Sequence, residues 1–390
     1  MSLLDLIKEA AAAADSETSV ESKYPIVLNA IPILSDLKAA KDDTDDIKLI
    51  KRVEGWKVSE TDTEIIESGN KFTKRLKKKL KNRKSFNTDE FLEILHSFLK
   101  KIVDLVNLSD DDLSSSVCLM LEKSGVFIGK NLLSLILEAS LKLEVWDVLK
   151  TLIIQGVTCV DLVEILVRKQ RSDLLCLCVK HVSDIQSDDF VSIFKYFLTL
   201  PKVSKKNMVG VKEDWENQAS LAIESCSSRK NDKSLLAKEA SLLLWVAYDG
   251  FTPAELCLHY LFASSNLDSL TLSYVLSRLN GTEMLSLIKY LGKWLKKYEK
   301  FPQANPCPKA GKKLGLKACD WVPSLKSIVK YLGLVLDEHF SKLVLYTEFQ
   351  EELRLINGVV QSLASEARLC CSVADVVENL KLETQSQRDA

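Results

Sequence analysis

The chain has 390 residues, 46% of them apolar and 27% charged, and a formal net charge of -1. These values are ordinary for a soluble globular protein, and the length is enough for one elongated or two compact domains. Only 13 glycines and 8 prolines are present, which favours helices joined by short polar links, because a β-rich fold of this length needs many more turn residues. No stretch approaches ~18 uncharged apolar residues, so the sequence predicts no membrane-spanning helix.

The first residues of the chain and its ten cysteines indicate a protein of a reducing compartment. The stretch MSLLDLIKEAAAADSETS is amphipathic, with neither the basic leader nor the uninterrupted apolar core of a signal peptide. Most cysteines lie inside apolar helical runs, as Cys118, Cys159, Cys176 and Cys257 do. We therefore expect thiols that pack as small buried apolar groups, and no disulfide framework.

Charge is distributed unevenly along the chain. Residues 71–84 contribute +9 without one acid, and residues 289–317 contribute +8, which leaves -18 on everything else. Like charges this close repel one another, so such runs indicate an anionic partner or a receptor. The sequence predicts an acidic body with two basic patches.

Residues 1–60 are expected to form an N-terminal segment of their own, a short helix over 1–14 followed by an extended arm. The arm mixes proline, serine and an acidic cluster with short apolar pieces. In the next segment, 61–86, Ile65, Gly69, Phe72, Leu76 and Leu80 recur every three or four residues. This spacing predicts a basic helix with one thin apolar seam.

From residue 87 onward helical patterns follow one another with few interruptions, and we assign 87–390 to one helical domain. Several segments start with Ser, Thr or Asp and stop at Gly, Pro or a polar pair. Two loops are expected, one over 202–210 and a basic one over 299–320, where three prolines lie. The prediction is an all-α fold, an irregular α-solenoid of stacked helical hairpins with the N-terminal arm extended.

One segment, GVFIGKN at 125–131, resembles a phosphate-binding loop. It has three residues between its glycines where that loop has four, and Asn131 where serine or threonine contacts magnesium. It also follows a helix pattern, where a phosphate-binding loop follows a strand. The sequence predicts the end of one helix and the start of the next.

The cysteine and histidine groups do not form a predicted metal site. In CLCVKH at 176–181, Cys176 and Cys178 point about 200° apart on a helix, so one ion could not bind the whole group. Cys307 and Cys319 flank the basic loop without two further ligands. Residues 337–339, Asp-Glu-His, diverge in the same way and are expected at the polar C-terminal end of a helix. We predict no catalytic residue, no metal, no cofactor and no small-molecule ligand.

The first basic patch is interpreted as a nuclear import signal whose cations also neutralise RNA phosphates. It comprises Lys71, Lys74, Arg75, Lys77, Lys78, Lys79, Lys81, Arg83 and Lys84. The second basic patch comprises Lys293, Lys296, Lys297, Lys309, Lys312, Lys313 and Lys317. Tyr290, Trp294 and Tyr298 lie among these lysines at helical spacing, and we expect packing residues, with stacking on bases as the alternative.

Residues 320–363 contain a distinctive order of residues, in which a Pro-Ser-Leu helix start leads to an aromatic residue and then to Leu-Asp-Glu-His-Phe. The residues that carry it are Pro323, Ser324, Leu325, Ile328, Tyr331, Leu336, Asp337, His339 and Phe340. Two helical blocks precede it, at 171–201 and 282–300. In this order the blocks resemble the C-terminal helical region of the nucleolar protein 11 family, over residues 165–385.

The resemblance implies a nucleolar subunit of the small-subunit processome that performs no chemistry itself. It also implies other transcription-linked processome proteins as partners, in pre-ribosomal RNA synthesis and early cleavage. Family members usually carry a β-propeller before the helical region, and no such pattern is present here, so the expectation is a shortened relative.

Composition and resemblance together predict a non-catalytic scaffold in the nucleus and nucleolus, with no membrane contact and with pre-rRNA contacted through the basic segments. The alternative is a cytoplasmic α-solenoid adaptor in protein assembly or membrane traffic. That alternative predicts exclusion from the nucleus.

Overall fold

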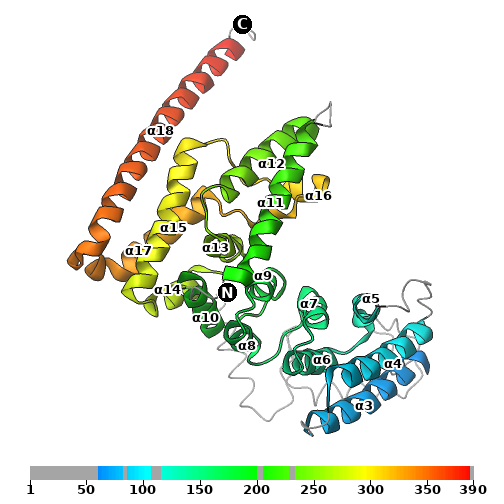
Figure 1. Cartoon of the computed structure of the whole chain (residues 1–390). Helices are drawn as coiled ribbons and strands as arrows, with labels where there is room; N and C mark the ends of the chain where they lie inside the picture. The colour runs from blue at the N-terminus through cyan, green and yellow to red at the C-terminus, as the bar shows by residue number, and fades with distance from the viewer. Residues whose placement is uncertain (1–59, 82–85, 107–115, 200–204, 228–232, 387–390) are drawn as a thin grey trace, which may run out of the picture. The chain divides into compact units, whose positions relative to one another are not determined.

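The computed structural model describes residues 60–81, 86–106, 116–199, 205–227 and 233–386. The described residues from Thr61 onward belong to one compact unit (Figure 1). Within these ranges the chain forms sixteen α-helices and two 3-10 helices and no strand, which confirms the all-α prediction. The stacking of hairpins into a solenoid stays a prediction. The N-terminal helix and arm predicted over 1–59, and Arg83 and Lys84, lie outside the described residues.

The first helices of the unit begin with two long ones, of 22 and 19 residues, and continue with shorter ones. They are α3 Glu60–Lys81, α4 Thr88–Val106, α5 Val117–Ser124, η2 Gly125–Phe127, α6 Lys130–Lys142 and α7 Trp146–Ile154. The predicted seam of α3 is confirmed, because Leu76 is fully buried and Phe72 stacks on Phe98 of α4 with ring centroids 4.3 Å apart. A helix end at η2 followed by the start of α6 is also confirmed where the sequence resembles a phosphate-binding loop.

The next helices contact both the helices before them and the helices after them in the chain. They are α8 Leu162–Arg168, α9 Ser172–His181, α10 Ser187–Thr199, α11 Lys205–Ser227 and α12 Lys233–Tyr248. α9 packs against α7, α8, α11 and α13, and α10 packs against α8, α13, α14 and α15. The loop predicted over 202–210 is wrong from Lys205 onward. There α11 has already begun, because Met208, Val211 and Trp215 share one buried side of it.

The last helices include α18, the longest helix among the described residues. They are α13 Pro253–Ala263, α14 Ser269–Ser277, α15 Gly281–Lys300, α16 Pro308–Leu314, η4 Lys317–Trp321, α17 Leu325–Leu345 and α18 Thr347–Ser386. Side chains that accept a backbone N–H fix four of the helix starts, namely Thr252, Asp268, Asn280 and Ser324. Each such cap is worth about 1 kcal/mol.

The basic loop predicted over 299–320 is wrong, because most of this segment is helical. α15 continues through Lys300, α16 has Pro308 at its start, and η4 follows. Proline suits the first turn of a helix, where its missing N–H has no partner to lose. Gly315, at φ 75°, ends α16 in the left-handed conformation that glycine adopts without strain.

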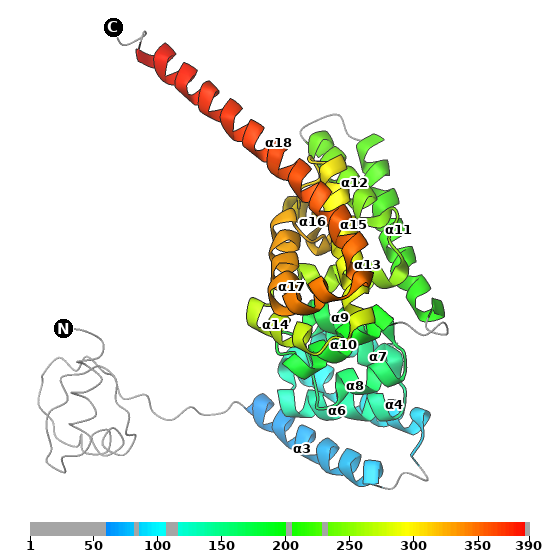
Figure 2. The same ribbon diagram turned by 90° about the vertical axis from the view of Figure 1, so that its left-hand side faces the viewer.

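α18 is divided into an inner half that is packed and an outer half that is not. Its first turns pack against α15 and α17, and a Cβ at Gly292 of α15 would lie 3.1 Å from Ile356 Cγ1 of α18. From residue 365 to residue 382 every side chain is exposed. Figures 1 and 2 show this outer half running clear of the other helices drawn. Across the described ranges, every helix is too short or too polar to cross a lipid bilayer.

Candidate functional site

The first basic patch lies on α3, and the structure supplies acids that the sequence segment itself lacks. Glu90 of α4 pairs with Lys79 at 2.5 Å, and Glu67 lies one turn before Lys71 at 3.7 Å. Five further cations of α3 are exposed and form no ion pair with the described part of the chain; they are Lys74, Arg75, Lys77, Lys78 and Lys81. These five cations are what α3 offers to an anionic partner.

The second basic patch is divided by ion pairs with acids on neighbouring helices. Lys293 Nζ lies 2.7 and 2.9 Å from the carboxylate oxygens of Glu255 on α13. Lys297 Nζ lies 2.7 Å from Asp249 Oδ2. Surface pairs of this kind contribute little to stability, about 0–1 kcal/mol, but they cancel charge locally. The interpretation of this segment as one cationic surface is therefore wrong for these two lysines.

The remaining cations of the second patch lie on different elements. Lys296 is exposed on α15, and Lys309, Lys312, Lys313 and Lys317 are exposed on α16 and η4. α16 packs against α12 and η4. The four cations on α16 and η4 therefore do not continue the row of lysines on α15.

The aromatic residues among those lysines are packing residues, as the sequence analysis expected. Tyr290 and Trp294 are fully buried and Tyr298 nearly so, which excludes the alternative of stacking on bases in this fold. Tyr290 and Trp294 lie against a buried histidine, His259. Its Nε2–H donates to the Ala247 carbonyl at 3.0 Å, and its Nδ1 accepts from the Tyr290 hydroxyl at 2.9 Å. Burial lowers the pKa of His259 to about 3, so the ring is neutral in the fold.

The thiols vary in exposure more than the sequence predicted. Cys176, Cys178, Cys257 and Cys319 are buried, Cys118 and Cys159 are half-buried, and Cys370 and Cys371 are exposed. Burial raises the pKa of Cys159 to about 11 and that of Cys319 to about 12. Both thiols therefore stay protonated at neutral pH and are poor nucleophiles. Among the described residues, no three His, Cys, Asp or Glu side chains are grouped to hold a metal ion.

The residues that carry the family resemblance form the start and the middle of α17. Pro323 is buried, and its carbonyl accepts a hydrogen bond from the Tyr298 hydroxyl, while Ser324 caps the helix. The buried and half-buried members pack inward; they are Leu325, Ile328, Tyr331 and Leu336. Asp337 and Phe340 are exposed. The motif thus has a packed part and a part on the surface.

His339 lies at a kink of α17, where its backbone leaves the helical region at φ -120°, ψ 17°. Its buried Nε2–H donates to the Leu276 carbonyl at 2.8 Å, near the C-terminal end of α14. The expectation that residues 337–339 lie at the end of a helix is confirmed for the first segment of α17, which is interrupted at His339; a second helical segment continues to Leu345. The partner carbonyl belongs to another helix, which the sequence cannot specify.

An apolar stripe on the outer half of α18 is a functional candidate that the sequence analysis did not single out. The stripe comprises Leu369, Cys370, Val373, Val376, Val377 and Leu380, all exposed. At 100° per residue these side chains span about 120° of the helix surface, the width of a face that packs against a partner. The spacing i, i+4, i+7, i+11 is readable in LCCSVADVVENL, but it does not distinguish a buried face from an exposed one.

The stripe is not the continuation of the face that α18 buries on α15. Phe349, Ile356 and Val359 are the buried side chains of the inner half. On the same helical projection their centre lies about 90° from the centre of the stripe. The outer half therefore presents a separate surface.

A comparison with protein families found no family model that matches the chain, and a comparison with curated proteins found no matching relative.

Proposed function

We propose that the chain is a non-catalytic nucleolar scaffold of the small-subunit processome, which supports pre-rRNA transcription and processing. The observation that carries the scaffold role is the apolar stripe on the outer half of α18. The family resemblance at 320–363 supports the location of the scaffold in the nucleolus and the processome. The exposed cations of α3 support nuclear import and contact with RNA phosphates.

The stripe has the properties of a helix that docks into a groove of a partner protein. Anchors at i, i+4, i+7 and i+11 are the pattern of that recognition mode. The stripe covers about two heptads, which is too short for a stable two-stranded coiled coil with a second copy. Helices in proteins gain most of their stability from packing one face, and this half of α18 packs none within the described chain.

Purification of the tagged chain from its own cells at gentle salt tests the proposal. Processome subunits together with precursor ribosomal RNA are the expected co-purifying molecules. A Val373→Glu, Val376→Glu double variant places two carboxylates in the stripe. We expect it to lower the recovery of protein partners at least about tenfold, because burying one such side chain is worth about 1.5–3 kcal/mol.

The matched control is Leu270→Glu on α14, whose side chain is 81% exposed and lies outside the stripe. This control should keep the partners. Coat or tether proteins without precursor RNA would overturn the processome assignment and favour the cytoplasmic adaptor. Partners retained by the double variant would overturn the role of the stripe.

A further inference from the structure

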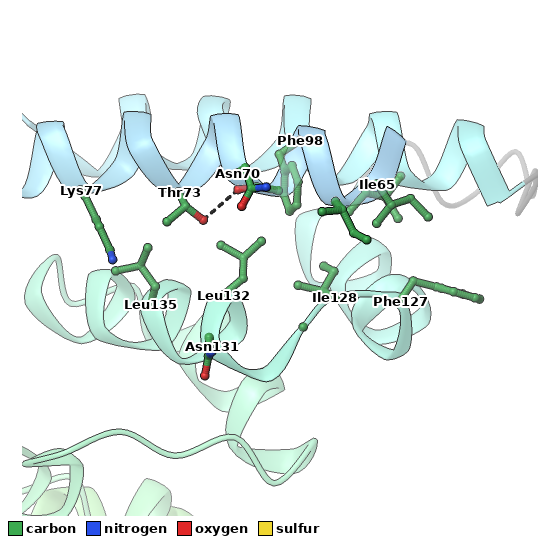
Figure 3. Close-up of a pocket in the computed structure, with 14 residues that line it drawn as sticks. Ile65, Asn70, Thr73, Lys77, Phe98, Phe127, Ile128, Asn131, Leu132 and Leu135 are labelled. Carbon is green, nitrogen blue, oxygen red and sulfur yellow. Dashed lines mark hydrogen bonds between the residues drawn. The ribbon is translucent and has the colours of Figure 1, made fainter. Parts of the chain in front are cut away.

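A trough runs between α3 and the η2–α6 segment, and none of the functions described above uses it. Its cavity measures 330 Å³, and its floor contains Phe98 and Ile102 of α4, both buried. Ile65 of α3 and Ile128 of the η2–α6 segment face each other across it in Figure 3. The two walls come close together at Gly69, where a Cβ would lie 3.4 Å from Leu132 Cδ2.

The two ends of the trough differ in chemistry. At one end lie Ile65, Phe127 and Ile128, and at the other lies Lys77 beside Leu135 (Figure 3). The apolar end is incompletely covered, since Ile66 is 55% and Phe127 44% exposed. Lys77 forms no ion pair with the described residues. The trough therefore has an apolar end and a cationic end.

The cationic end belongs to a wider positive surface. Lys74, Lys78 and Lys81 follow one another along α3 at i, i+4 and i+7 and are exposed. A bound molecule that extends from the apolar end to Lys77 lies in the positive potential of these lysines, so the charge at that end affects its affinity. Charge complementarity therefore selects carboxylates at that end of the occupant.

The dimensions of the trough select the conformation of the occupant. Ile65 and Lys77 are twelve residues apart on α3, or about 18 Å. The cavity volume of 330 Å³ spread over that length gives a cross-section of about 18 Å². An α-helix about 10 Å across needs about 80 Å². An extended chain fits, and about five or six of its residues span the distance.

We propose that this trough binds an extended acidic-apolar peptide segment of a partner protein, with apolar side chains at the Ile65–Phe127 end and carboxylates at Lys77. RNA is the other macromolecule that α3 could attract. The trough contains two aromatic residues, however, and of these Phe98 is buried against Phe72, so bases find few aromatic faces on which to stack. The inference adds a peptide-binding site to the proposed scaffold role. It rests on that role only in taking the partner to be a protein.

Fluorescence anisotropy of a labelled probe peptide with the purified full chain tests this inference. The probe has about ten residues, with phenylalanine and leucine at one end and three glutamates at the other. Two comparison peptides have lysines in place of the glutamates, or serines in place of the apolar residues. We expect the probe to bind at least about tenfold more tightly than either comparison peptide.

Variants at exposed positions locate the binding without disturbing the core. Ile66→Glu and Lys77→Glu should each weaken probe binding about tenfold, whereas Ile66→Leu and the surface control Leu270→Glu should not. An oligouridylate of about twenty nucleotides serves as the RNA probe. Its binding should be weakened by Lys77→Glu and be insensitive to Ile66→Glu if it uses charge alone.

The outcomes separate this inference from the proposed function. Probe binding that is insensitive to Ile66→Glu, or equal binding of the serine peptide, would overturn the trough as the site. Oligouridylate binding that Ile66→Glu weakens as much as probe binding would assign the trough to RNA and overturn the peptide. If processome proteins do not co-purify with the tagged chain, the proposed function is overturned. The peptide-binding measurement does not depend on that result and stays valid.

Discussion

Acidification should destabilise the chain through His259, and the size of the effect follows from its surroundings. The ring is buried and neutral, with a pKa lowered from 6.5 to about 3 by desolvation. Between these values the unfolded chain binds a proton that the folded chain does not. The stabilisation is therefore fully present above pH 6.5 and is lost as the pH falls toward 3, at about 1.4 kcal/mol per pH unit.

Urea unfolding followed by tryptophan fluorescence at pH 7 and at pH 5 measures this loss against a His259→Gln variant. From pH 6.5 to pH 5 the linkage amounts to about 2 kcal/mol, so the wild type should lose about that much more free energy of unfolding than the variant. Glutamine does not titrate, but it retains a donor for the Ala247 carbonyl. The variant starts from a lower stability, which cancels in the difference between the two pH values.

An equal loss of stability in the wild type and His259→Gln would refute the reasoning. It would mean that the ring gains a proton in the fold, or that the cluster opens before the rest of the chain. A ring that titrates between pH 7 and pH 5 in the NMR spectrum of the native protein would refute it independently. Every other carboxylate and histidine is common to both chains and drops out of the comparison.

Three further predictions concern α18, the thiols and α3. Gly292→Leu should push α18 away from α15 and speed amide hydrogen exchange over residues 347–363, since a Cβ at this position is already in tight contact. Gly333→Leu is the control, because a Cβ there meets nothing within 4 Å, and it should leave the exchange rates unchanged. A thiol reagent should modify Cys370 and Cys371 in the native protein before any buried thiol, and early modification of a buried cysteine would contradict the packing. Lys78→Ala should reduce the slope of log affinity against log salt for single-stranded RNA by about 0.7, and an unchanged slope would exclude this residue as a phosphate contact.

Helices with strong local signals were predictable from the sequence, and one with a weak signal was not. The Pro-Ser-Leu start of α17 places a serine where its side chain caps the first turn. α11 begins within a polar stretch that contains a glycine, and its apolar residues Met208, Val211 and Trp215 are few. Their burial comes from contacts with α9, α12 and α13, which no local pattern contains.

The candidate sites were predictable only in part, because charge pairing depends on contacts between distant residues. The row of cations on α3 is visible in the sequence, but the acid that pairs with Lys79 comes from another helix. Lys293 and Glu255 are 38 residues apart, so their pairing follows only from the packing of α13 on α15. The stripe around Val373 is visible as spacing, yet only the fold shows that nothing in the described chain covers it.

Because the two halves of α18 form one continuous helix, the exposed outer half moves with the packed inner half. The exposed residues 365–382 extend about 27 Å beyond the last packed turns, at 1.5 Å per residue. A tilt of about 5° where Ile356 meets Gly292 would displace the far end of that span, about 39 Å from the pivot, by about 3 Å. Small repacking on α15 is therefore amplified at the stripe, while the core of the chain stays in place.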